Sequence, residues 1–265
     1  MDLNFKIDMK NSSASYSDDL NFITRKIKNT IKLDYMYNVL MIVSIITGPL
    51  LIILIPLFFI LKMLNRSKPV YLDYNFGDED KIKYFELSEA WREISKSHLC
   101  RLVVRAENLD NNKRNAGASK SLTLQPCFIT DVKQFYIKTN VDFVTIGYNK
   151  NKTQLLILPD KLYFVGAEIK CINYSDVKIE VNDVQYIEKG FVPKDAQILR
   201  HTYKHVNKDG SPDKRFSDNP KYSVCKYAGV ALSSSNNVLD INIMISNADS
   251  TDKLKSYVGK YGGGV

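Results

Sequence analysis

The chain has 265 residues, of which 45% are hydrophobic and 25% are charged, and its formal net charge is +8. This length holds one large domain or two small ones. The four cysteines are widely spaced and include no CxxC pair, which argues against a zinc ribbon. The sequence has no nucleophile elbow, no HExxH motif and only three histidines. We therefore expect neither an enzyme nor a bound cofactor.

The segment before the first long apolar run divides into two parts. Residues 1–17 are polar, and we expect them to be disordered. Residues 18–38 predict an amphipathic helix, because apolar side chains recur at helical spacing: Leu20, Ile23, Ile27 and Ile31. Its other faces carry the cations Arg25, Lys26, Lys28 and Lys32. This helix is expected either to lie along anionic headgroups or to extend the apolar segment that follows.

An apolar segment over residues 39–64 is the clearest feature of the sequence. From Val39 to Leu61 it contains no charged residue. A helix that crosses a hydrocarbon core needs roughly 20 such residues, so the run predicts a transmembrane anchor. The run starts too late in the chain, and is too long, for a cleaved signal peptide.

Two prolines leave the topology of this segment open. Pro49 and Pro56 each remove a helical hydrogen bond. In the favoured interpretation, Gly48-Pro49 kinks a single spanning helix; in the other, it is the apex of a re-entrant hairpin whose ends emerge on one face. Lysines and arginines flank the segment on both sides, which is typical of a hairpin and is tolerated by a single crossing.

The part of the chain after the anchor is expected to begin with a helix. Residues 65–79 have the composition of a linker, and we assign the domain itself to residues 80–262. The run Asp78-Glu79-Asp80 supplies negative charge where a helix N-terminus favours it. Apolar residues at helical spacing then predict a helix over 80–98 and place Trp91 in the core rather than on a ligand platform.

Strands are predicted from Leu99 onward, where short apolar runs alternate with turn residues. They are Leu99–Glu107, Ser121–Ile129, Phe135–Ile146, Gln154–Leu158, Lys161–Val165, Glu168–Asn173, Val177–Val184, Tyr222–Leu232 and Val238–Ser246. A terminal helix follows from Asp249, with Leu254 and Val258 as its apolar stripe. The order predicts a mainly β fold with flanking helices, in which a rolled sheet or partly open barrel is closed at one end by the terminal helix.

Two short motifs resemble those of bacterial pleckstrin-homology-like domains. One is the segment Leu155–Val165, with Asp160-Lys161 at a tight turn, and the other is Ile172–Val177, with Tyr174 where the next strand begins. The resemblance implies that the terminal helix plugs a barrel of this type.

A longer series of motifs is similar to a widespread family of uncharacterised bacterial proteins. In the same order as in that family, they are KRNAGAS (113–119), KTNV (138–141), LPDKL (158–162), VPKDA (192–196) and HTYKHVNKDGSPDKRF (201–216). The resemblance covers roughly residues 80–247, implies a cytoplasmic domain and carries no activity. It favours free thiols at Cys100, Cys127, Cys171 and Cys225 over two disulfides. Together with the anchor, it predicts a protein of the bacterial inner membrane whose soluble domain is cytoplasmic.

The basic segment from His201 to Asn219 is the most unusual local feature. Its cationic side chains are His201, Lys204, His205, Lys208, Lys214 and Arg215. In one interpretation they form an anion site, for a lipid or nucleotide phosphate, at the mouth of the barrel. In the favoured interpretation, the motif residues pin the loop itself, with Asp209 or Asp213 paired to Arg215. A metal ion at the two histidines is not expected, because the sequence places no third ligand.

The segment Lys113-Arg114 is a second weak candidate for ligand binding. It lacks the strand and glycine-rich frame of a phosphate loop. We expect a tight connection between strands with Gly117 at positive φ. A role of Lys113 and Arg114 in ligand binding stays open.

Charge and anchor together lead to two functional hypotheses. A basic domain held at a bilayer is attracted to anionic lipid. The sequence lacks the alternation of aromatic and basic residues that is typical of RNA-binding sheets, so we do not expect nucleic acid as a partner. The first hypothesis is a membrane-anchored, non-enzymatic interaction or scaffolding module that binds a protein partner, a further copy of itself or an anionic lipid headgroup. The second is a ligand-gated membrane effector whose soluble domain senses a small anionic signal of the nucleotide type.

Overall fold

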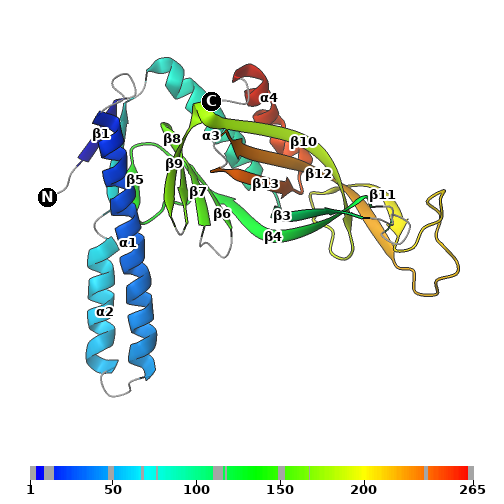
Figure 1. Cartoon of the computed structure of the whole chain (residues 1–265), viewed down its shortest axis with the longest axis horizontal. Helices are drawn as coiled ribbons and strands as arrows, with labels where there is room; N and C mark the ends of the chain where they lie inside the picture. The colour runs from blue at the N-terminus through cyan, green and yellow to red at the C-terminus, as the bar shows by residue number, and fades with distance from the viewer. Residues whose placement is uncertain are drawn as a thin grey trace.

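The computed structural model describes residues 4–8, 15–46, 51–66, 69–75, 77–109, 116, 118–148, 153–166, 168–235 and 238–261. Figure 1 shows three parts in a row: a pair of long helices, a small sheet beside them, and a large curled sheet that carries two further helices. The fold is mainly β, and its large sheet forms a half-barrel accompanied by a C-terminal helix. The predicted fold class is confirmed at that level.

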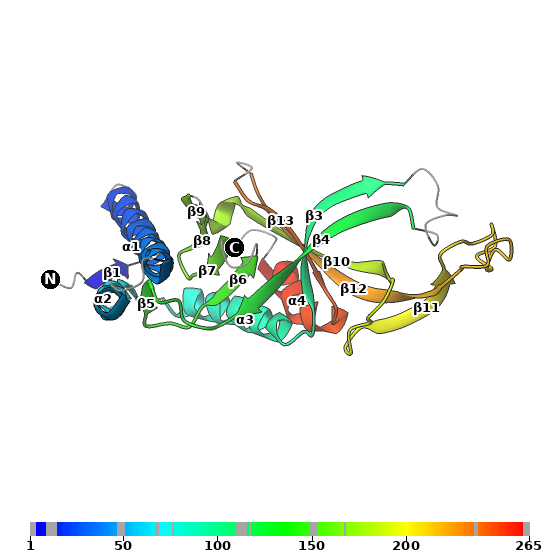
Figure 2. The same cartoon turned by 90° about the horizontal axis from the view of Figure 1, so that it is seen from below.

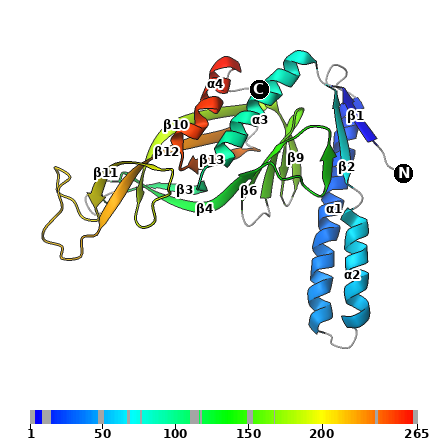
Figure 3. The same ribbon diagram turned by 180° about the vertical axis from the view of Figure 1, so that it is seen from behind.

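The apolar segment forms part of two helices rather than one. Helix α1 spans Ser15–Ile46 and helix α2 spans Leu51–Arg66. They lie side by side and run in opposite directions (Figures 1 and 3). The prediction of one continuous helix through residues 39–64 is therefore wrong; Gly48 and Pro49, between the helices, lie outside the described residues. Among the residues that are described, no helix is both long enough and apolar enough to cross a membrane.

The first half of α1 belongs to the body of the protein. Ile23 and Ile27 are fully buried in the same apolar cluster as Leu72 of the small sheet and Tyr163 of the large one. Thr24 Oγ1 lies 3.6 Å from Cys171 Sγ on the edge strand β9 (Ile169–Asn173). The apolar stripe of α1 therefore packs on protein, and α1 continues without a break into the apolar segment. This is the second of the two arrangements expected for residues 18–38.

The small sheet is built from segments that are far apart in the sequence. Strands β1 (Asn4–Asp8), β2 (Val70–Asn75) and β5 (Ile137–Thr139) pair in parallel, in the order β1-β2-β5. Three predictions are wrong here: β1 lies in the expected disordered terminus, β2 lies in the expected linker, and the expected strand Phe135–Ile146 is split. Parallel pairing explains these errors, because it depends on distant partners that no local sequence pattern reveals.

The large sheet contains ten strands in a curled, largely antiparallel arrangement. Its path is β10-β12-β13-β3-β4-β6-β7-β8-β9, and β11 also pairs with β12. The strands not yet bounded are β3 (Cys100–Asn108), β4 (Lys120–Thr130), β6 (Val144–Tyr148), β7 (Thr153–Ile157), β8 (Lys161–Val165), β10 (Val177–Glu188), β11 (Gln197–Tyr203), β12 (Lys221–Ser234) and β13 (Asp240–Ile245). Strand β11 was not predicted, and β10 is longer than predicted because it pairs with β12 along its whole length.

Two helices cover one face of the large sheet (Figure 2). Helix α3 spans Asp78–Ser95, and α4, which spans Asp252–Tyr261, follows a 3-10 turn. Trp91 of α3 is 1% exposed and lies in one cluster with Leu254 of α4 and Ile243 of β13. The predicted core position of Trp91 is confirmed. Burial of this cluster supplies the main apolar driving force for the fold.

The LPDKL motif joins the two sheets through partly buried hydrogen bonds. Asp160 accepts one bond from Tyr74 of β2 and one from Tyr163 of β8, each at 2.8 Å. Burial, and then the charge of Asp160, raise the pKa of Tyr74 well above its usual value. The Tyr74 phenol thus stays protonated, and both hydroxyls donate to one carboxylate.

We expect the Asp160→Asn substitution to lower the free energy of unfolding by about 2 kcal/mol, because an amide has one acceptor oxygen where the carboxylate has two. Urea denaturation followed by tryptophan fluorescence measures this loss. Asp218→Asn, at a side chain that is 87% exposed, is the control and should change stability by less than about 0.5 kcal/mol. Equal effects of the two substitutions would contradict the proposed role of Asp160.

All four cysteines are free thiols, as predicted. Cys100 of β3 and Cys127 of β4 face each other across neighbouring strands. Burial raises the pKa of Cys100 to about 12 and raises the pKa of Cys127 further, and the pKa values of Cys171 and Cys225 are raised for the same reason.

The thiolate is the reactive form, so we expect the native thiols to react slowly with Ellman's reagent at pH 8 and rapidly once urea has unfolded the chain. A cysteine introduced at exposed Lys28 should react at once in the folded protein. Fast reaction of the native thiols in folded protein would show that they are not buried.

Candidate functional site

Two surfaces at opposite ends of the molecule carry the features that the sequence singled out. The α1–α2 hairpin projects at one end, and the basic segment and β11 lie at the other (Figure 1). We call residues 35–46 of α1 and 51–64 of α2 the hairpin arm. We call the far end of β3, β4, β10, β11 and β12, with the loop between β11 and β12, the loop end.

The hairpin arm carries exposed apolar side chains on both helices. The sequence has no charged residue between Asp34 and Lys62. Ile42 of α1 and Leu57, Phe59 and Ile60 of α2 are all exposed, the most exposed being Ile42 and Phe59 at 59% each. Contiguous exposed apolar surface of this kind marks a membrane or protein contact.

A polar contact closes the base of the hairpin arm. Lys62 Nζ donates to Asn38 Oδ1 at 2.7 Å, which ties α2 to α1. The same ammonium lies 5.5 Å from the centre of the Phe58 ring. Beside them, Tyr35 is 68% exposed. An aromatic ring and a cation at one level are typical of residues at a membrane–water interface.

The cations predicted to face the membrane surface precede Asn38 on α1, so they lie between the Asn38–Lys62 contact and the β domain. Arg25, Lys28 and Lys32 are exposed on α1, and Lys26 is half-buried. Lys32 precedes Asn38 by six residues, or about 9 Å along the helix.

The loop end is a two-layered structure. The β3–β4 hairpin arches over β10, β11 and β12 (Figure 2). Between the layers, Cys225, Tyr227 and Met244 are buried against Leu124 of β4 and Val184 of β10. This small second core holds the two layers together.

A buried ion pair adds to this core. Arg101 of β3 donates to Glu188 of β10 at 2.8 Å, and Glu188 also accepts the hydroxyl of Tyr227. Burial, and then the nearby Glu188 carboxylate, raise the pKa of Tyr227. The Arg101 guanidinium also lies 5.8 Å from the centre of the Tyr186 ring. These contacts fix the ends of β3 and β10 relative to each other.

The basic segment is pinned by its own side chains. The Arg215 side chain donates three hydrogen bonds to the Asp213 carboxylate, at 2.9, 3.2 and 2.6 Å, and lowers the pKa of Asp213 to about 2. Asp209 accepts a hydrogen bond from the Ser211 N–H. The Asn219 side chain accepts a hydrogen bond from the His205 N–H and donates one to the His205 carbonyl. The favoured interpretation of this segment is confirmed for Arg215, which pairs with Asp213.

The other cations of the basic segment are dispersed. Lys204 lies 3.9 Å from Asp218, and the His205 ring stacks on Phe216 at 3.9 Å. His201, Lys208 and Lys214 are exposed. Within the described ranges, no group of three or more metal-ligating side chains occurs.

The structure brings two of the sequence motifs together. Ala116 of the KRNAGAS motif donates its N–H to Lys204 O at 3.1 Å, and its carbonyl accepts from Thr202 Oγ1 at 3.0 Å. Ala116 itself adopts a positive φ of 56°. Lys113, Arg114 and Gly117 lie outside the described residues, so their predicted roles stay predictions.

The VPKDA motif has a similar bracing role. Asp195 accepts from the His98 N–H and from the Ser246 hydroxyl, each at 2.7 Å. It thereby joins the loop before β11 to the start of β3 and the end of β13.

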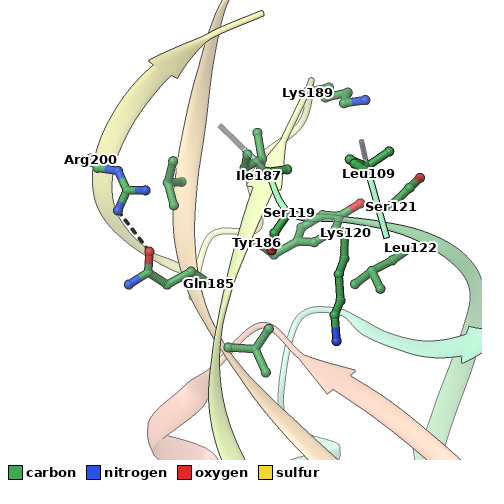
Figure 4. A pocket seen from close by; sticks show the side chains of 13 residues that line it. Leu109, Ser119, Lys120, Ser121, Leu122, Gln185, Tyr186, Ile187, Lys189 and Arg200 are labelled. Atoms are coloured by element: carbon green, nitrogen blue, oxygen red, sulfur yellow. Dashed lines mark hydrogen bonds between the residues drawn. The ribbon is translucent and has the colours of Figure 1, made fainter. Parts of the chain in front are cut away.

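A cavity of about 470 Å³ lies between the layers of the loop end (Figure 4). Aliphatic side chains of β4, β10 and β12 form its wall, among them Leu122, Val184, Ile187 and Val224. Tyr186 and the hydroxyls of Ser119 and Ser121 also line it. Its size is within the range of small-molecule sites.

Three cations among the described residues line this cavity, and sequence reasoning missed all three. They are Lys120 of β4, Lys189 just after β10 and Arg200 of β11. They come from three different parts of the chain that only the folded sheet brings to one cavity, so no local motif marks them. Of the cations predicted for the basic segment, His201 lies in β11, and the others lie in the loop between β11 and β12.

In comparisons with known proteins, no family model, curated protein or solved structure matches this chain. The resemblance to pleckstrin-homology-like domains and to the bacterial family therefore stays a prediction.

Proposed function

We propose that this protein is a non-enzymatic interaction module of the bacterial inner membrane, in which the hairpin arm inserts into one leaflet. The observation that carries the proposal is the run of exposed apolar side chains on both helices of the arm, closed at its base by the contact between Asn38 and Lys62. Burying such side chains in lipid stabilises the inserted state by on the order of 1 kcal/mol each.

The length of the arm supports insertion into a single leaflet. From Leu51 to Leu61, α2 has eleven uncharged residues, which rise about 16 Å at 1.5 Å each. One leaflet contributes about 15 Å, half of the roughly 30 Å hydrocarbon core. An arm of this length places its tip near the middle of the bilayer and Lys62 at the headgroups.

Both helices of the arm return to the same body. The start of α1 packs on the large sheet, and α2 leads into β2 of the small sheet. In the proposed state, the β domain lies at the cytoplasmic surface. Exposed Lys28 and Lys32 then face anionic headgroups, each contributing roughly 1 kcal/mol where it comes close to the surface.

The proposal also covers the fold family of the β domain and its binding partners. The half-barrel with its terminal helix supports a pleckstrin-homology-like domain, and the family motifs at the loop end support a role in binding there. In this proposal the domain binds a protein partner, a further copy of the chain or an anionic headgroup, and it carries out no reaction.

Cysteine labelling in bacterial spheroplasts tests the topology. Lys28→Cys and Glu79→Cys place exposed thiols before and after the arm. With a membrane-impermeant maleimide, we expect neither to react in intact spheroplasts and both to react after lysis. Labelling of one position alone in intact spheroplasts would show that the arm crosses the membrane, contrary to the proposal.

A further inference from the structure

The cavity of the loop end combines an unopposed positive charge with an apolar wall. Among the described residues, its lining includes Lys120, Lys189 and Arg200 but no aspartate or glutamate. Within the described part of the chain, neither lysine takes part in an ion pair, and Arg200 donates only to the neutral Gln185, at 2.9 Å. Elsewhere, cations such as Arg92, Lys178 and Lys260 pair with carboxylates.

Two of the cations flank an aromatic ring. In Figure 4 the Tyr186 ring lies between Lys120 on one side and Lys189 on the other, and Arg200 stands across the strand. The aliphatic wall continues this surface on both layers. A ligand that uses all of these groups has a flat or apolar body and an anionic end.

We propose that this cavity binds an organic phosphate with a planar ring system, for which a nucleoside monophosphate is the simplest probe. The ring lies against Tyr186 and the aliphatic wall, and the phosphate accepts hydrogen bonds from the flanking Lys120 and Lys189. The site lies at the opposite end of the molecule from the hairpin arm and does not depend on membrane insertion.

Binding is measured by the fluorescence anisotropy of GMP that carries an N-methylanthraniloyl label, using the full chain with phosphatidylcholine vesicles. We expect saturable binding that unlabelled GMP displaces. Lys120→Glu and Lys189→Glu should each weaken it about tenfold or more, because a charged hydrogen-bond partner is replaced by a repulsive one. Lys214→Glu makes the same charge change in the neighbouring loop, where the side chain is exposed and does not line the cavity, and should leave affinity within twofold.

Two results would overturn the proposal. One is the absence of displaceable binding to the unsubstituted chain at millimolar nucleotide. The other is an equal loss of binding in Lys214→Glu, which would indicate general attraction to a basic surface. Thermal unfolding of each variant shows whether the fold is retained, and vesicle flotation reports separately on the hairpin arm.

Discussion

Substituting aspartate for both Ile42 and Leu57 is expected to release the protein from phospholipid vesicles. Both side chains are exposed, and they lie on the two helices of the hairpin arm beyond the Asn38–Lys62 contact. Placing a carboxylate inside the hydrocarbon costs about 2 kcal/mol per site at this depth. The two together amount to about 4 kcal/mol, or a roughly thousandfold loss in vesicle affinity measured by flotation.

The matched control introduces the same charge on the β domain. Val104→Asp and Val132→Asp, combined, alter two exposed apolar side chains that lie far from the arm in the sequence. Flotation of this variant should stay within about threefold of the unsubstituted chain, since exposed surface changes have small effects. If both double variants float equally well, the arm does not hold the protein at the membrane.

Loss of Arg101 is expected to have the largest effect on stability. The Arg101→Met substitution leaves Glu188, which is 7% exposed, as a buried carboxylate without its cation. Removing one partner of a buried ion pair typically costs about 3–5 kcal/mol. Urea denaturation should therefore show a fall of about 3 kcal/mol in the free energy of unfolding.

An exposed ion pair in the same strand gives the control. Arg105 lies 2.7 Å from Glu107, and their side chains are 71% and 53% exposed. Arg105→Met should cost less than about 1 kcal/mol, because water already screens that pair. The double variant Arg101→Met/Glu188→Gln should recover part of the loss, since the amide keeps an acceptor for Tyr227 and removes the unpaired charge. A cost of Arg101→Met no larger than that of Arg105→Met would contradict the buried ion pair.

Local patterns in the sequence predict the antiparallel part of the fold well. The strand over Lys161–Val165 is found with the predicted bounds, and α3 begins at the predicted acidic run Asp78-Glu79-Asp80. Alternating apolar residues and nearby turns suffice in these cases, because each strand pairs with a close neighbour in the chain.

The rest depends on distant contacts. Strand β11 is edge-like, with five exposed residues at its start, so no alternation marks it. The helical hairpin requires α1 to pack on β9, which is well over one hundred residues away. The same reason explains the candidate sites: the pairing of Arg215 with Asp213 is local and was predicted, whereas the ion pair of Arg101 with Glu188 and the cavity cations are brought together only by the sheet.

Depth-dependent fluorescence quenching tests the membrane arm most directly. A fluorophore is attached at Leu57→Cys or at Met63→Cys, since both positions are exposed, whereas the native thiols are buried or half-buried and have raised pKa values. With lipids that carry a nitroxide along the acyl chain, we predict strong quenching at position 57 and weak quenching at 63; a headgroup nitroxide should reverse the order. Equal and weak quenching at both positions with both lipids would place the arm in water and contradict insertion into a leaflet.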